Sequence, residues 1–90
     1  MSKPTKLERS VMHLLADDED VTYAEGFDEA AIGIARGFNG VPVMAYDRAK
    51  CIEILSRDMS PEEAEEFFSF NVSGAYVGES TPIFIERIKQ

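Results

Sequence analysis

The amino-acid sequence predicts one α+β domain over residues 1–90, with its elements in the order helix, strand, strand, helix, helix, strand. Two observations indicate this class. Apolar residues recur at helical spacing in three segments, and three short apolar runs have the character of strands. Ninety residues without a linker or an internal repeat fit a single core. We therefore expect a three-stranded antiparallel sheet in the order 2-1-3, with the helices packed on one face.

The first predicted helix follows Thr5, which can cap its N-terminus. Its apolar residues fall at i, i+4, i+7 and i+8, the spacing of one helical face: Leu7, Val11, Leu14 and Leu15. The acidic run Asp17–Asp20 then opposes the helix dipole. We therefore expect the helix to end near Ala16 and the acidic run to be solvated.

Two strands joined by a hairpin are predicted next, at residues 30–35 and 41–46. The connection Gly37–Gly40 contains an Asn-Gly pair, which favours a tight turn in which both residues adopt positive φ. Pro42 has no amide proton to donate, so the second strand should lie at an edge of the sheet or start at this residue. The first strand is expected to be buried on both faces.

Two helices follow in close succession. Asp47 can cap the first of them, whose apolar stripe is Cys51, Ile52, Leu55 and Met59. Ser60 begins the second, because Ser60 at the N-cap and Glu63 at N3 form a capping box and Pro61 suits the first helical position. The predicted inner stripe of this helix is Ala64, Phe67, Phe68 and Val72. After Gly74, residues 74–82 are expected to form a loop and residues 83–88 the last strand.

The charge balance limits the classes of partner. Seventeen acidic residues against nine basic ones give a net charge of -8. Binding to a nucleic-acid backbone needs clustered Lys and Arg, so we expect no nucleic-acid partner. Contact with a basic protein surface is compatible with this charge, although solubility alone also accounts for it.

The cysteine count and the apolar runs indicate a compartment. A single cysteine, Cys51, excludes an internal disulfide and suits a reducing environment. No apolar run approaches the roughly 20 residues of a membrane span. We expect a cytoplasmic protein without a membrane partner.

Few residues suit catalysis, a metal or a cofactor. His13 and Cys51 are the only residues of their kinds, too few for a zinc site, and the acidic run lacks the spacing and central Gly of a calcium loop. His13 lies on the outer face of its predicted helix and Cys51 on an inner face, so a Cys-His pair is not expected. No phosphate-binding glycine motif is present. We therefore assign no catalytic residue, no metal ligand and no cofactor.

The best candidate binding surface is the loop from Asn71 to Pro82, since binding residues often lie on loops held by a rigid scaffold. Asn71 can bond free carbonyls at a helix end, and Tyr76, Glu79 and Thr81 offer an aromatic face, a charge and a hydroxyl. Asp47 adjoins a strand end and is the further candidate. The alternatives are that Asp47 only caps its helix and that the loop is a folded connector.

Phe70 is the candidate for a contact between two copies of the chain. At 3.6 residues per turn it projects about 120° from the inner stripe, on the side of Glu63 and Glu66. A lone subunit would leave this ring in water, and an open sheet edge also invites pairing. We expect a homodimer. The competing possibility is that the Asn71–Pro82 loop folds back over Phe70.

One further set of segments, between about Tyr23 and Ile85, consists of Gly26–Ala30, Tyr46-Asp47, Cys51–Leu55, Glu63-Ala64, Phe70–Val72, Gly74–Glu79 and Thr81-Pro82. In these residues the chain resembles a group of small uncharacterised proteins found mostly in phage and other prokaryotic genomes. The resemblance implies no activity, but it does imply an accessory gene that acts inside a bacterial cell.

Three functions are compatible with these observations. The first is a small acidic, non-enzymatic interaction protein that contacts a basic host protein. It would mimic nucleic-acid charge if its acidic segments, Asp17–Glu29 and Asp58–Glu66, shared one face. The second is a ligand-binding protein or enzyme that uses the Asn71–Pro82 loop with Asp47. The third is a structural role as an oligomer.

Overall fold

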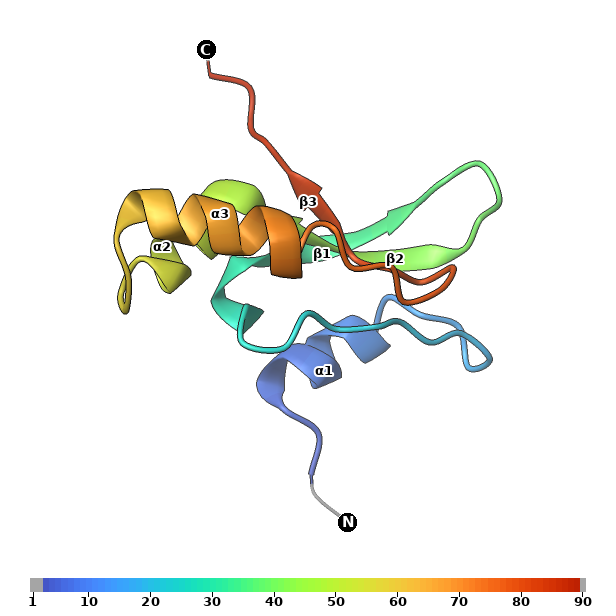
Figure 1. Ribbon diagram of the computed structural model, residues 1–90. Helices are drawn as coiled ribbons and strands as arrows, with labels where there is room; N and C mark the ends of the chain where they lie inside the picture. The colour runs from blue at the N-terminus through green and yellow to red at the C-terminus, as the bar shows by residue number, and fades with distance from the viewer. Residues whose placement is uncertain (1–2, 90) are drawn as a thin grey trace.

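The computed structural model describes residues 3–89, which form three α-helices, one short 3-10 helix and three strands (Figure 1). In chain order these are α1 (Lys6–Met12), η1 (Asp28–Ala30), β1 (Ala31–Arg36), β2 (Pro42–Asp47), α2 (Arg48–Leu55), α3 (Pro61–Asn71) and β3 (Ile83–Ile85). The predicted α+β class and the order of helices and strands are confirmed, and η1 was not predicted. Residues 1, 2 and 90 of the predicted domain lie outside the described residues.

The sheet differs from the predicted one in order and in direction. Its order is β1-β2-β3, so β2 is central and the predicted order 2-1-3 is wrong. β1 pairs with β2 antiparallel, but β3 pairs with β2 parallel, so the sheet is mixed and not purely antiparallel. The connection explains the direction. Residues 48–82 carry α2 and α3, and a helical crossover of this kind returns the chain to pair in parallel.

The burial of the two long strands follows from these positions. Met44 and Tyr46 of the central strand β2 are both 0% exposed. Pro42 is the first residue of β2, one of its two predicted places, where the missing amide proton interrupts no ladder. No residue of the edge strand β1 is buried, so the expectation that this strand is covered on both faces is wrong.

The hairpin between β1 and β2 is confirmed, but its turn is not the predicted one. The Gly40 amide donates to the Gly37 carbonyl at 3.0 Å. Gly40 has a φ of 76°, whereas no residue other than glycine has a positive φ among residues 3–89. Asn39 therefore keeps a negative φ, and its side-chain oxygen accepts the Val41 amide at 3.0 Å.

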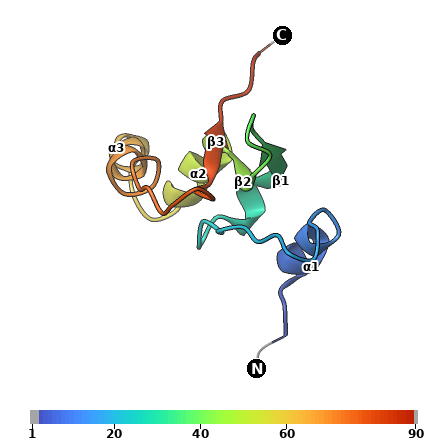
Figure 2. The same cartoon turned by 90° about the vertical axis from the view of Figure 1, so that its right-hand side faces the viewer.

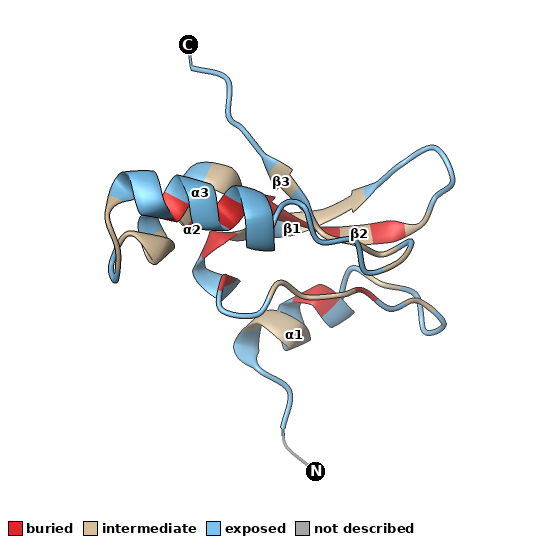
Figure 3. Cartoon of the chain, viewed as in Figure 1, coloured by how far each residue is buried: buried red, intermediate tan, exposed pale blue. Residues whose placement is uncertain are grey.

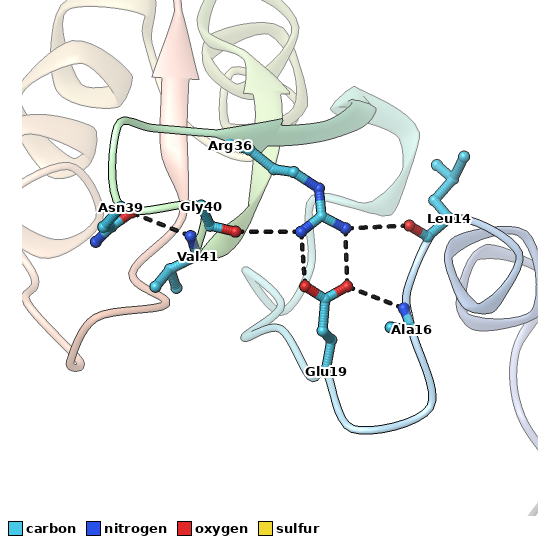
Figure 4. Close-up of polar contacts among 7 residues, drawn as sticks. All are labelled: Leu14, Ala16, Glu19, Arg36, Asn39, Gly40 and Val41. Carbon is cyan, nitrogen blue, oxygen red and sulfur yellow. Dashed lines mark hydrogen bonds and ion pairs between the residues drawn. The ribbon is translucent and has the colours of Figure 1, made fainter.

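Helix α1 begins where the sequence predicts and ends earlier. Thr5 caps it in a capping box with Glu8, with bonds of 3.1 and 2.9 Å. The helix ends at Met12, not near Ala16, so Leu14 leaves the predicted stripe and is 57% exposed. The Leu14 carbonyl accepts a bond from Arg36 of β1 at 3.3 Å, a contact that a continuing helix would compete with (Figure 4).

The core lies on the face of the sheet that carries Met44 and Tyr46 (Figure 3). Val11 of α1, Cys51 of α2 and Phe68 of α3 all belong to it, so each of these helices contributes a buried side chain to this cluster. The other buried members are Val21, Phe27 and Ala30. The Tyr46 hydroxyl accepts the Ala24 amide at 2.8 Å, which connects the strand to the segment before η1.

Candidate functional site

Helix α3 is held rigidly at its start by the predicted cap. The Ser60 hydroxyl accepts the Glu63 amide at 3.2 Å, and the Glu63 carboxylate accepts the Ser60 amide at 3.4 Å. Pro61 occupies the first turn, where its missing amide proton costs no bond. Both ends of the predicted capping box are therefore confirmed.

One narrow stripe of α3 faces the core. Ala64 is 0% and Phe68 1% exposed, and the Phe68 ring meets Phe84 of β3 edge-on, with centroids 4.9 Å apart. The Arg48 guanidinium covers the same Phe68 ring at 5.2 Å from its centroid. These contacts fix the rotation of α3 about its own axis. The remaining side of the helix faces solvent.

Phe67 and Phe70 both lie on that solvent side. Phe67 is 42% and Phe70 76% exposed, so the prediction that Phe67 belongs to the inner stripe is wrong. Ala64 and Phe68 are one helical turn apart and suffice to face the core, which turns Phe67 away. The loop after α3 does not cover Phe70. The two rings share an open hollow with Met59, Glu63, Glu66 and Asn71, which we call the α3 face.

The α3 face is strongly acidic. No Lys, Arg or His occurs from Asp58 to Glu86, whereas seven Asp and Glu residues do. Arg48 pairs with Glu65 at 2.7 Å and lowers the pKa of that carboxyl through the hydrogen bond. Within residues 3–89, neither Glu62 nor Glu66 forms an ion pair. Their charges are left for solvent or for a partner.

The Asn71–Pro82 loop is a folded connector for part of its length. The Asn71 side-chain amide donates to the Phe67 carbonyl at 3.2 Å, as expected for a helix end. The Thr81 hydroxyl accepts the Val77 amide at 2.9 Å and donates to the Gly78 carbonyl at 2.5 Å. Thr81 is therefore used within the loop. Tyr76, at 74%, and Glu79 are exposed.

The loop also forms one wall of a groove of about 200 Å³ whose other wall is the segment before η1. Asn71 and Thr81 line this groove together with Tyr23, Phe27 and other mainly apolar residues. Tyr76, Glu79 and Asp47 do not line it. Partial burial, together with the carboxylates of Glu8, Asp20 and Asp28, raises the pKa of Tyr23, so this hydroxyl stays protonated at neutral pH. The groove therefore suits an apolar group better than acid–base chemistry.

Asp47 does not line this groove, and its bonds are to Lys50 and Arg87. Its carboxylate caps α2 by accepting the Lys50 amide at 3.4 Å and pairs with Arg87 at 2.8 Å. Burial alone would raise the pKa of Asp47, but the bonds from Arg87 and Lys50 outweigh it and lower the pKa. The carboxylate is thus ionised and occupied. The sequence also suggests one site formed by Asp47 with the Asn71–Pro82 loop. Among residues 3–89, the groove lined by Asn71 and Thr81 and the hollow lined by Asp47 have no residue in common, so these two do not form that site.

The remaining reactive groups are inert or exposed. Burial raises the pKa of the Cys51 thiol to about 11, so almost none of it is thiolate at neutral pH. His13 is exposed at the end of α1. No group of three or more potential metal ligands lies close together among residues 3–89. In this part of the chain, no helix has both the length and the apolar character to cross a membrane.

The two acidic segments lie apart at the start of the first, but its last residue, Glu29, pairs at 2.9 Å with Arg57, which immediately precedes Asp58. In Figures 1 and 2 the loop with Asp17–Asp20 follows α1, at the far side of the molecule from the start of α3. Glu19 in this loop is bonded to Arg36 (Figure 4). The expectation that the whole acidic run is solvated is therefore wrong for Glu19. The acidic loop around Glu19 and the start of α3 are therefore not parts of one continuous acidic surface.

Comparison of the chain with models of known families, with curated proteins and with solved structures finds no match.

Proposed function

We propose that this protein is a small acidic, non-enzymatic interaction protein that binds a basic partner protein through the α3 face. The observation that carries the proposal is the pair of exposed rings, Phe67 and Phe70, beside Glu63 and Glu66 in one hollow.

The two rings supply the binding energy. Burying a Phe side chain fully is worth about 1.5–3 kcal/mol, and a monomer in water gains nothing from rings left as exposed as these. Aromatic side chains are enriched among the residues that dominate protein interfaces. The α3 face lies on a helix that is held in place by its N-terminal cap and by the buried Phe68. Binding a partner therefore costs little conformational entropy in the backbone of this face.

The charges select the partner. Glu62 and Glu66 have no ion-pair partner among the described residues, and the nearest bases along the chain, Arg57 and Arg87, pair with Glu29 and Asp47. A second copy placed against the α3 face would bring like charges together across the interface, which is costly. A protein surface with Lys or Arg around an apolar pocket fits both the rings and the carboxylates.

The cellular setting is part of the same proposal and is supported by the resemblance to proteins of phage and prokaryotic genomes. We place the protein in a bacterial cytoplasm as an accessory of a phage or a mobile element. Its lone cysteine is buried as a thiol, which suits a reducing compartment.

A comparison of matched baits tests the proposal. Wild-type protein, Phe70→Ser and Phe38→Ser are immobilised and exposed to bacterial lysate at low salt. Phe38 is the matched control, because it is fully exposed at the hairpin tip and lies outside the α3 face. We expect a protein with a basic surface to be retained by the wild type and by Phe38→Ser, lost by Phe70→Ser and released by added salt. Identical retention by all three baits would contradict the proposal.

A further inference from the structure

The face of the sheet opposite the core is apolar and only partly covered: Ala45 at its centre is 4% exposed, whereas the isoleucines around it are open to solvent. Side chains alternate along β2, so Val43 and Ala45 point away from the face of Met44 and Tyr46. Ala45 pairs with Gly33 of β1 and with Ile83 of β3, and Asp47 pairs with Ile85. Ile83, Ile85 and Ile32 are 42%, 36% and 46% exposed. We call Ile32, Val43, Ala45, Ile83 and Ile85 the outer sheet face.

None of the helices of residues 3–89 lies over the outer sheet face. Figures 1 and 2 show α1 on the other side of the sheet and α2 and α3 beside it. The side chains that pack against the core cluster come from the helices, from the segment between α1 and η1, and from the strands. In β1 and β3 they include Ile34 and Phe84, which pair with Met44 and Tyr46 and so lie on the face opposite the outer sheet face. An apolar sheet face without a second layer is an incomplete architecture, since stable domains bury such a face against another element.

The charges at the rim of this face are balanced. Ile32 shares a shallow hollow with Glu29, Asp47, Lys50 and Arg87, two acids and two bases. Asp47 pairs with Arg87 at 2.8 Å and Lys50 with Glu53 at 3.3 Å. This balance contrasts with the net charge of -8 of the whole chain and with the α3 face, which has no base.

We propose that a second copy of this chain covers the outer sheet face, so that the protein is a two-fold dimer of sheets. A two-fold interface places the same patch on both subunits, and a patch with both signs of charge is complementary to itself. Two chains that each carry -8 can meet here without bringing carboxylate against carboxylate. A basic partner is disfavoured at this rim by Lys50 and Arg87. The proposal does not rest on the proposed function, which uses another surface.

The required area shows which residues must take part. A standard interface buries about 800 Å² per partner, roughly an eighth of the 6705 Å² surface of this chain. Three strands about 4.8 Å apart, one of them only three residues long, are too narrow to supply this area alone. The segment after β3 adjoins the face, and its Ile88 is 87% exposed. We therefore include Arg87 and Ile88 in the interface.

The first test is the mass in solution. At tens of micromolar, light scattering should give the mass of two 10.0 kDa chains for the wild type. Ile85→Lys and, on another strand, Ile32→Lys should each reduce this to one chain, whereas Phe70→Glu should remain two. A wild-type mass of one chain would overturn the proposal. So would a Phe70→Glu variant that dissociates while the two isoleucine variants do not.

If the isoleucine variants do not fold, an NMR measurement on the wild-type protein tests the same dimer. A soluble paramagnetic agent broadens NMR signals of exposed methyl groups. On raising the protein concentration, the Ile32, Ile83 and Ile85 methyl signals should become protected, while the Phe38 ring signals stay broadened. Isoleucine signals that broaden equally at all concentrations would overturn the dimer on this face.

Discussion

The guanidinium of Arg36 and the carboxylate of Glu19 form a two-pronged ion pair, with nitrogen–oxygen distances of 2.6 and 2.8 Å (Figure 4). Arg36 also donates to the Leu14 carbonyl at 3.3 Å and to the Gly40 carbonyl at 3.1 Å. One side chain thus joins three segments: the end of α1, the acidic loop and the β1–β2 hairpin. The pair therefore ties the loop after α1 to the end of β1.

The pH dependence of stability should report this ion pair. The Arg36 hydrogen bond and the Ala16 amide hold the pKa of Glu19 at about 2, below its ordinary 4.5. A depressed pKa gives stability that is present above about pH 4.5 and is lost as the pH falls toward 2. In Arg36→Gln, chemical denaturation should show a smaller loss over that range than in the wild type. Arg9→Gln is the control, and an unchanged pH profile in Arg36→Gln would contradict the assignment.

The cap of α3 should contribute measurably to stability. Ser60→Ala removes the acceptor for the Glu63 amide, so the free energy of unfolding should fall by about 1 kcal/mol. Ser69→Ala makes the same chemical change on the exposed side of the same helix and should alter the stability by no more than about 0.5 kcal/mol. Equal effects in urea denaturation would mean that the cap is not the cause.

Replacing the two adjacent phenylalanines of α3 by alanine should reduce the stability of the domain to very different extents. Phe68→Ala opens a cavity against Phe84 and Arg48 and should cost about 3–5 kcal/mol, enough to unfold so small a domain. Phe67→Ala removes a ring that already meets water and should leave a folded protein. Circular dichroism during thermal melting distinguishes them. A large loss of stability in Phe67→Ala alone would reverse our orientation of the helix.

Duplex DNA should not bind. The net charge is -8, and among residues 3–89 four of the basic side chains, Arg36, Arg48, Arg57 and Arg87, are already paired with carboxylates. A gel-shift experiment at physiological salt should show free DNA at every protein concentration below the millimolar range. A salt-sensitive shift at micromolar protein would contradict this prediction.

Local features of the fold could be predicted from the sequence because their causes lie within a few residues. Ser60 and Glu63 are three positions apart, and Asp47 caps the helix that follows it directly. The side on which Phe70 projects follows from helix geometry alone. The exposure of Phe70 beside Glu63 and Glu66 could therefore be anticipated, and it is the basis of the candidate site.

The features that could not be predicted depend on distant residues. The parallel pairing of β3 with β2 is decided by where α2 and α3 return the chain, which no local signal records. Glu19 and Arg36 are 17 positions apart, and nothing within the acidic run Asp17–Asp20 marks Glu19 as the carboxylate that pairs with a distant arginine. Phe67 and Phe68 are the same residue type. Which of the two is buried depends on the width of the buried stripe of α3, and that width is set by the distant residues against which the helix packs.

Photo-crosslinking in living bacteria tests whether the α3 face contacts a basic partner protein. A photoreactive phenylalanine derivative replaces Phe70 in one variant and Phe38, equally a surface ring, in another. We predict a discrete crosslinked product at position 70 that is absent at position 38, and that disappears when Glu62→Lys and Glu66→Lys are added. Crosslinking at position 70 that matches position 38, or that survives the charge reversals, would contradict the account.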